Sequence, residues 1–132
     1  MEYKEYTNEE LKVILDNHFL WLSSDGAKGK QAVITNANLE GEDFSNMDLS
    51  EADLTFSILT SAIMTKTKLI NTILVDTVLK NAVLIGADLT DADISGADFE
   101  GADLTDADLS GTDILYANFE GADLTDAKGI EI

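Results

Sequence analysis

Large apolar residues recur at every fifth position along most of this 132-residue chain. The series has 19 members without an insertion and ends where the next step falls on Gly129. Neither a helix, with about 3.6 residues per turn, nor a flat strand, with a period of two, places residues five apart on one side. The chain must therefore turn every five residues, and four such turns close a square coil of about 20 residues. The series consists of Ile34, Leu39, Phe44, Leu49, Leu54, Leu59, Met64, Leu69, Leu74, Leu79, Leu84, Leu89, Ile94, Phe99, Leu104, Leu109, Ile114, Phe119 and Leu124.

A second column, of small residues, lies two positions before each large residue. Seventeen of its 19 members are Ala, Ser or Thr, and the exceptions are Glu42 and Met47. Residues two apart on an extended segment share a side, so both columns should point inward and all 19 large residues should be buried. Gly, Asn and Asp recur two positions after the large residue, which predicts corners with positive φ.

Residues 20 apart should stack in ladders, with neighbouring coils about 4.8 Å apart. The rings of Phe99 and Phe119 should therefore stack on each other. The same stacking brings outward aspartates together, and repulsion between like charges would raise their pKa values. Hydrogen bonds from N–H groups at the corners would act in the opposite direction. The stacked pairs are Asp88 with Asp108, Asp93 with Asp113 and Asp103 with Asp123.

The repeats resemble the pentapeptide-repeat family, whose consensus is A-(D/N)-L-x-x. Segments such as GADLT, GADFE, NANLE and YANFE stand close to this consensus, and the resemblance covers residues 32–127. It implies an all-β fold, a right-handed quadrilateral β-helix of about 4.75 coils. Residues 11–32 also resemble the helical leader of bacterial and phage members. We therefore expect a bacterial or phage-type protein in the cytoplasm.

The chain divides into three parts. Residues 1–31 hold an N-terminal tail, a capping helix over about 8–22 and a Gly-containing turn; residues 32–127 form the solenoid; residues 128–132 are a short C-terminal tail. The sequence Thr7-Asn8-Glu9-Glu10 is a capping box. The helix that follows is apolar on one face and should cover the first coil, with His18 packed in the cap.

Composition excludes several classes of function. The chain has 26 acidic residues, 8 Lys, no Arg, no Cys and one His, for a net charge of -18. This charge opposes direct binding to nucleic acid or anionic lipid, and no apolar run approaches the roughly 20 residues that span a bilayer. Stacked carboxylates on a flat side do not converge as calcium ligands must. We expect no enzymatic activity, no cofactor and no metal site.

The outward residue before each large one is apolar in the middle of the chain, except at Lys68, and nearby outward positions such as Phe56 and Ile70 are apolar as well. Such β-branched residues suit strands even when half exposed, whereas a contiguous apolar surface usually contacts a partner. The interaction belt, as we name it, could also support self-association, for which the C-terminal coil is a competing site. The belt comprises Phe56, Ile58, Ile63, Ile70, Ile73, Val75, Val78, Val83 and Ile85.

Aspartate returns to the outward position in the last third of the chain. Residues 87–126 carry 12 acidic residues and no Lys. The sequence favours a non-catalytic scaffold that binds another protein, and the alternative is an acidic DNA mimic. The family resemblance implies the latter because some members bind type II topoisomerases such as gyrase. Glu42 either leans outward or pairs with Lys28 or Lys30, and the alternative is a functional role. The candidate acidic face consists of Asp88, Asp93, Asp98, Asp103, Asp108, Asp113 and Asp123.

Overall fold

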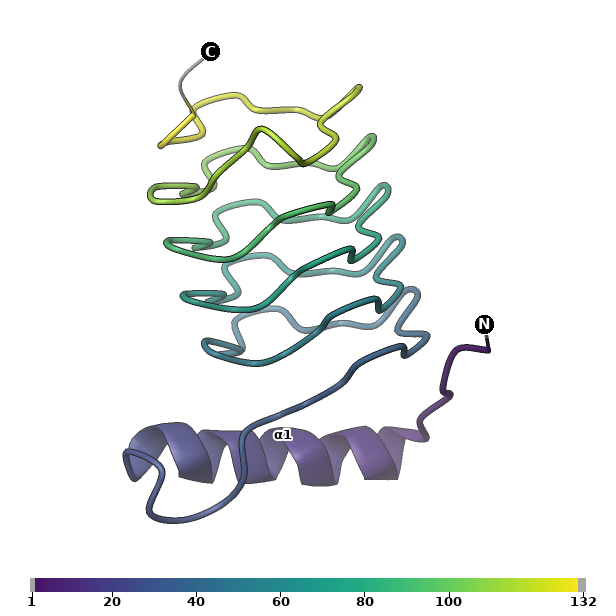
Figure 1. Cartoon of the computed structure of the whole chain (residues 1–132), viewed down its shortest axis with the longest axis vertical. Coiled ribbons are helices and arrows are strands. Elements are labelled where there is room, and N and C mark those ends of the chain that lie inside the picture. Colours follow the sequence, from purple (N-terminus) through teal and green to yellow (C-terminus); the bar gives the residue numbers. More distant parts are fainter. Residues whose placement is uncertain (1, 131–132) are drawn as a thin grey trace.

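A stack of coils follows one helix, α1 (Asn8–Ser23), in a computed structural model that describes residues 2–130. Helix α1 lies across one end of the stack, and the coils rise from it (Figure 1). The coils are joined by parallel bridges between residues 20 apart, from Val33 with Asp53 to Asp108 with Lys128. Each bridge is isolated, so the described residues contain no longer strand. Within residues 2–130, no helix combines the length and apolarity that crossing a membrane requires.

Helix α1 begins at the expected capping box and extends one residue beyond the expected 8–22. The Glu10 N–H donates to Thr7 Oγ1 at 3.1 Å, and the Thr7 N–H donates to Glu10 Oε1 at 2.9 Å. These two bonds satisfy donors that a helix N-terminus otherwise leaves free. The backbone N–H of Thr7 is also the main reason that the pKa of Glu10 lies below its usual value.

Four ladders of bridges define four sides, which we number in chain order. A residue on one side is followed five positions later by a residue on the next side, and 20 positions later by its neighbour in the adjacent coil. Side 1 passes through residues 33, 53, 73 and 93; side 2 through 38, 58, 78, 98 and 118; side 3 through 43, 63, 83, 103 and 123; and side 4 through 48, 68, 88, 108 and 128.

The interior matches the two inward columns over most of its length. The first 16 large residues, from Ile34 to Leu109, are buried. The remaining three, Ile114, Phe119 and Leu124, are half-buried, so the expectation that all 19 are buried is wrong for the last coil. Among residues 2–130 this coil is paired on one side only, which leaves its apolar side chains partly uncovered. The Phe99 and Phe119 rings stack as expected, with centroids 5.0 Å apart.

The corners adopt positive φ as predicted, and not only at Gly, Asn and Asp. Phe56 has a φ of 60° and Lys66 a φ of 56°. For residues other than Gly this left-handed conformation costs about 1–2 kcal/mol, so the stacked coils impose it. At Gly96 the preceding coil supplies a further constraint, because an added Cβ would meet a carboxylate oxygen of Asp76.

The register is interrupted once, on side 1 of the last coil. The expected bridge between Asp93 and Asp113 is absent from the described bridges, and the Gly96 N–H donates to the Tyr116 carbonyl at 2.8 Å. At the other corners the acceptor lies 19 residues ahead, as for Gly101 and Glu120, so the pairing here shifts by one residue. A left-handed Tyr is costly, and a coil paired on one side only does not enforce it. The unbroken register expected through Leu124 is therefore wrong at this corner.

Buried hydroxyl groups donate hydrogen bonds to backbone carbonyls of the preceding coil. Each hydroxyl donates to the carbonyl of the large residue 23 positions earlier; Thr72 Oγ1, for example, lies 2.9 Å from the Leu49 oxygen. These polar side chains are thus satisfied in a dry interior. The donors are Ser57, Thr67, Thr72 and Thr77.

Helix α1 closes the first coil through a buried histidine. His18 is 0% exposed; its Nδ1 accepts the Ala32 N–H at 2.9 Å, and its Nε2 lies 2.9 Å from the Ser50 carbonyl oxygen. Because Nδ1 accepts, Nε2 carries the proton and donates. The packing role expected for His18 is confirmed. The tail adds a feature that the sequence did not indicate, a parallel bridge between Lys4 and Ala37.

Candidate interaction surfaces

The interaction belt surrounds the rod, and parts of it are brought together. Ile58 stacks on Val78 on side 2, and Ile63 on Val83 on side 3, each as a bridged pair. Ile73 lies on side 1. The remaining members lie in the turns at the corners: Phe56, Ile70, Val75 and Ile85.

Phe56 is the most exposed residue of the interaction belt, and its backbone is held in the left-handed conformation. It lies at the corner between sides 1 and 2 with a φ of 60° and 42% of its surface exposed. Ile63 is 39% exposed, and Ile58, Ile73 and Val78 are half-buried. The belt is thus a partly accessible apolar surface whose first residue, Phe56, is an exposed aromatic at a corner.

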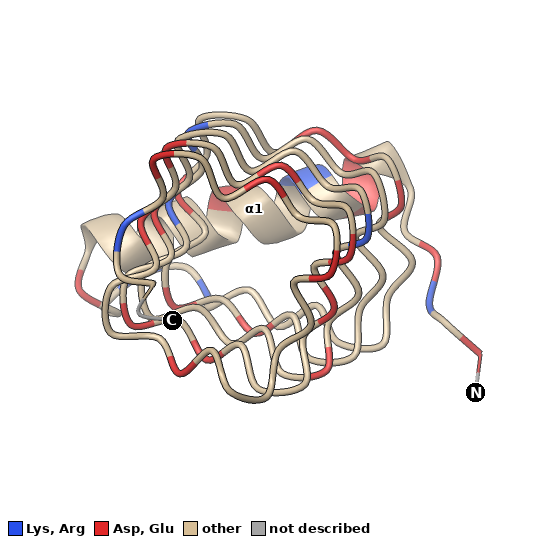
Figure 2. Ribbon diagram, turned by 90° about the horizontal axis from the view of Figure 1, so that it is seen from above, with Lys and Arg blue, Asp and Glu red and all other residues tan. Residues whose placement is uncertain are grey.

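The candidate acidic face is a band and not one side of the rod. Its seven residues occupy all four sides, and acidic residues encircle the coils when the molecule is viewed along its axis (Figure 2). We call this set the acidic band. The stacking of Asp88 on Asp108 and of Asp103 on Asp123 is confirmed. The stacking of Asp93 on Asp113 fails because of the register shift described above.

Each band carboxylate is engaged in its own turn. In Asp123, Oδ1 accepts the backbone N–H of Thr125 at 3.0 Å and its hydroxyl at 2.6 Å. The hydroxyl bond, and then the N–H bond, lower the pKa of Asp123 below its usual value. The same kind of bonds from Ser110 lower the pKa of Asp108. The expected rise in pKa from charge repulsion is therefore wrong for these two residues, because their hydrogen bonds favour the charged form.

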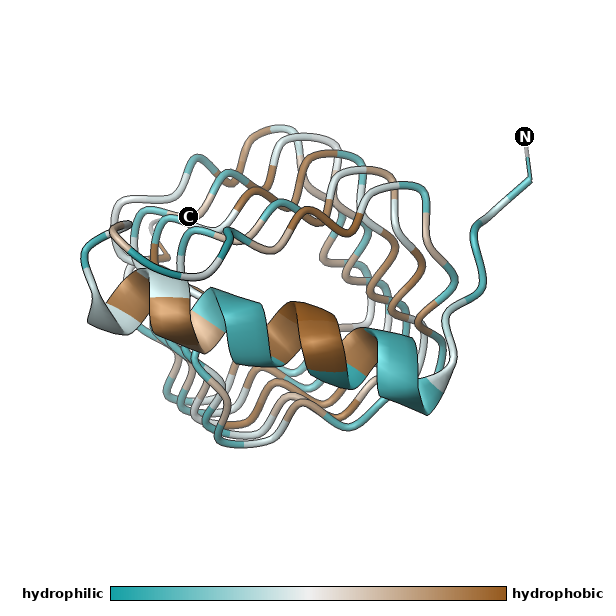
Figure 3. Ribbon diagram, turned by 90° about the horizontal axis from the view of Figure 1, so that it is seen from below, coloured by the Kyte–Doolittle hydropathy of each residue, from teal (hydrophilic) through white to brown (hydrophobic). Residues whose placement is uncertain are grey.

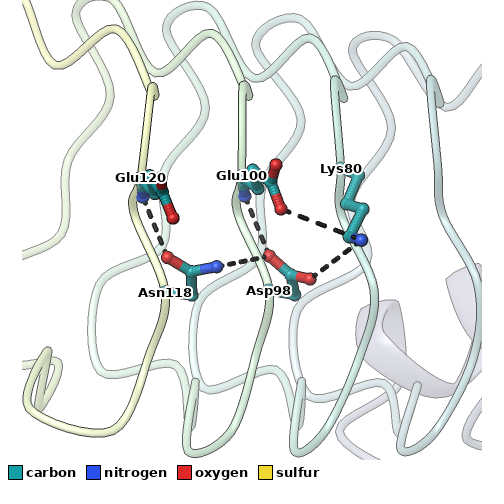
Figure 4. Close-up of polar contacts among 5 residues, drawn as sticks. All are labelled: Lys80, Asp98, Glu100, Asn118 and Glu120. Carbon is teal, nitrogen blue, oxygen red and sulfur yellow. Dashed lines mark hydrogen bonds and ion pairs between the residues drawn. The ribbon is translucent and has the colours of Figure 1, made fainter.

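One lysine links the belt to the acidic band on side 2. Lys80 Nζ lies 3.7 Å from Asp98 Oδ2 and 3.8 Å from Glu100 Oε2 (Figure 4). In the next coil, Asn118 Nδ2 donates to Asp98 Oδ1 at 3.1 Å. Exposed pairs of this kind contribute about 0–1 kcal/mol each, so the network orders the side chains at the boundary more than it stabilises the fold.

Glu42 makes neither of the contacts expected from Lys28 and Lys30. Glu42 is half-buried as a residue, and among residues 2–130 its carboxylate forms no ion pair and no side-chain hydrogen bond. It lines a depression between α1 and the first coil together with Met47. Sequence reasoning missed this depression, although the two exceptions in the small column marked its place. In the described part of the chain, no three His, Asp or Glu side chains converge as metal ligands would.

The four-sided coil with a five-residue period defines a repeat solenoid. The sequence profile of pentapeptide repeats matches in eight copies over residues 30–65, 62–101 and 102–128. The chain belongs to the pentapeptide-repeat family, whose members form right-handed quadrilateral β-helices.

Two solved structures illustrate this similarity. A pentapeptide repeat protein of the Arabidopsis thaliana thylakoid lumen is 36% identical, with a TM-score of 0.66 over 68% of this chain and 63% of its own. QnrB1, a plasmid-mediated fluoroquinolone resistance protein, is 23% identical, with a TM-score of 0.50 over 78% of this chain and 57% of its own. The chain thus spans less than two thirds of either protein, and the likeness to QnrB1 concerns the fold alone. No curated protein matches the sequence.

Proposed function

We propose that this chain is a non-catalytic solenoid that binds a protein partner through the interaction belt. Phe56 carries the proposal. An aromatic ring is held outward at a corner where its conformation costs about 1–2 kcal/mol, and 42% of it is exposed. The corresponding corners with Glu51, Ser61 and Lys66 have nearly the same φ but carry polar side chains, so a large apolar side chain is exceptional at Phe56. Bridged apolar pairs on sides 2 and 3, such as Ile58 with Val78, extend the surface on either side of the ring.

The variant Phe56→Asn tests this proposal, because Asn tolerates positive φ. The substitution should leave the free energy of unfolding unchanged or raise it by about 1 kcal/mol, while removing the contact. Ser61→Asn is the matched control, since Ser61 is an exposed corner residue with a φ of 59°. Proteins retained from a lysate of the source organism by the wild type and by Ser61→Asn should be lost with Phe56→Asn. Equal retention by all three would contradict the proposal.

Mimicry of DNA is a second candidate, favoured by the charge of the acidic band. Residues 87–126 carry 12 acidic residues without a Lys. The experiment is a supercoiling assay with a type II topoisomerase such as gyrase. If the band acts as DNA, the wild type should inhibit supercoiling, and Asp103→Asn with Asp123→Asn should weaken the inhibition. Asp43→Asn with Asp48→Asn removes equal charge from the first coil as a control.

A further inference from the structure

A groove runs between α1 and the first coil of the solenoid. One part of it, about 340 Å³ in volume, lies between the helix residues Leu11, Leu15 and Phe19 and the coil residues Phe44 and Met47. Leu11, Leu15 and Phe44 are buried at its floor, whereas Phe19 is 38% exposed. The surface that an incoming group would meet is therefore largely apolar.

The groove continues along the helix towards its C-terminal end. A neighbouring depression of about 610 Å³ is lined by Leu20, Leu22, Ser23 and Asp48 and shares Asp16 and Phe19 with the first. Helix α1 crosses the mouth of the first coil along its length, with apolar and polar segments alternating (Figure 3). Its 16 residues correspond to about 24 Å, which an extended peptide of roughly seven residues would match.

The edge of the groove is negatively charged. Asp16, Glu42, Asp43 and Asp48 line it, and its one basic residue, Lys12, is held by Asp16 at 2.6 Å. Glu42 is the most informative of these side chains. It occupies the inward column in which the next three coils place Ala62, Ala82 and Ala102, and it has no cationic partner among residues 2–130. A carboxylate beside apolar side chains attracts a cation that can share its apolar surroundings.

We propose that this groove binds a segment of a partner protein in which an Arg or Lys stands between apolar residues, with the cation at Glu42. The charge selects the cation, and Phe19 and Met47 contact the flanking apolar side chains. Because Phe56 lies on the belt and not in the groove, this site is independent of the proposed belt contact.

A short peptide with one charge tests the site without relying on the overall charge of the protein. The probe is a blocked peptide, Leu-Ser-Leu-Arg-Leu-Ser-Leu, and its comparison peptide carries Gln in place of Arg. Fluorescence anisotropy gives Kd, and methyl NMR shows where the peptide lies. The Arg peptide should shift the methyl signals of Leu11, Leu15 and Met47, and the Gln peptide should bind about tenfold more weakly, because a charge-assisted hydrogen bond is lost.

Matched variants separate the groove from diffuse attraction. Glu42→Gln should weaken Kd about tenfold, whereas Glu120→Gln, which removes the same charge from the last coil, should change it less than about twofold. Phe19→Ser should weaken binding, while Val13→Ser should not, since Val13 is 60% exposed on α1 outside the groove. Circular dichroism checks that each variant is folded. If Phe19→Ser does not fold, the comparison of Glu42→Gln with Glu120→Gln decides the test.

Three results would overturn the proposal. The first is equal weakening by Glu42→Gln and Glu120→Gln, which means nonspecific attraction to an acidic protein. The second is methyl shifts confined to the belt or the last coil. The third is no binding at millimolar peptide. Phe56→Asn should leave the peptide Kd unchanged, so failure of the belt proposal and failure of the groove proposal are distinguishable.

Discussion

Replacement of His18 tests how α1 is fixed to the solenoid. In His18→Phe the ring can keep its stacking on Trp21, where the ring centroids lie 5.8 Å apart. Both polar contacts are lost, which leaves the buried Ala32 N–H and the partly buried Ser50 carbonyl without partners. An orphaned buried donor costs about 1–3 kcal/mol and a lost partly buried bond about 0.5–1.5 kcal/mol. We therefore expect destabilisation of about 2–4 kcal/mol.

Two further substitutions separate the cost of losing the bond to Ala32 from the cost of losing the bond to Ser50. The Oδ1 of Asn occupies the position of His Nδ1, so His18→Asn can keep the bond from Ala32 and loses the bond to Ser50. The Nε2 of Gln occupies the position of His Nε2, so His18→Gln does the reverse. Because the Ala32 N–H is the more buried group, we expect Phe to cost the most, then Gln, then Asn.

Urea denaturation and thermal melts measure these differences. At this chain length a loss of 2–4 kcal/mol corresponds to a fall in Tm of roughly 8–16 °C. Hydrogen exchange supplies a local readout, since the Ala32 amide should lose protection in the Phe and Gln variants and keep it in Asn. A cost below about 0.5 kcal/mol for Phe, or a larger cost for Asn than for Gln, would refute the role assigned to the two bonds.

Hydrogen bonds lower the folded pKa of Asp108 and Asp123. The stability that these two carboxylates contribute is therefore complete above the unfolded pKa of about 3.9 and is lost as the pH falls through the folded pKa. Tm should not change between pH 8 and 5 on their account and should fall below about pH 4; a Tm that rises from pH 8 to 5 would mean that repulsion dominates. Gly29→Ala should disrupt the cap, because its Cβ would clash with the Asn17 carbonyl oxygen of α1. Gly41→Ala, where a Cβ meets nothing within 4 Å, should lower the free energy of unfolding in urea by only about 1–2 kcal/mol; equal costs for the two variants would contradict the clash. Leu79→Asp should prevent folding, since Leu79 is 0% exposed, and a cooperative melt of this variant would show that the side chain does not point inward.

The interior could be predicted from the sequence because each column requires the same kind of side chain, large and apolar or small, in every coil. A residue such as Leu79 is enclosed by identical geometry above and below, so the period alone determines its burial. The same reasoning failed at Ile114, Phe119 and Leu124, where burial depends on a neighbouring coil on both sides. The shift at Tyr116 has the same origin, since a costly corner conformation is kept only where stacked coils enforce it.

The surfaces were less predictable because they depend on local bonds that a repeat pattern does not show. The charge pattern located the acidic band, but the pKa values of Asp108 and Asp123 depend on their own turns. The pairing of Lys4 with Ala37 has no sequence signal. The groove at α1 did have one, because Glu42 and Met47 break the small-residue column in the coil that faces the helix.

The four-sided coil also couples chain length to orientation. Removal of one pentad where the interaction belt meets the acidic band, residues 86–90, would keep every interior column intact, because one large residue would still follow another at the same spacing. It would nevertheless rotate everything that follows by a quarter turn, so Asp103 would leave side 3, where it now bridges Val83, and come to side 2. Removal of 20 residues would restore the alignment. The angular phase between two surfaces on this rod is therefore set by the number of pentads between them, counted modulo four.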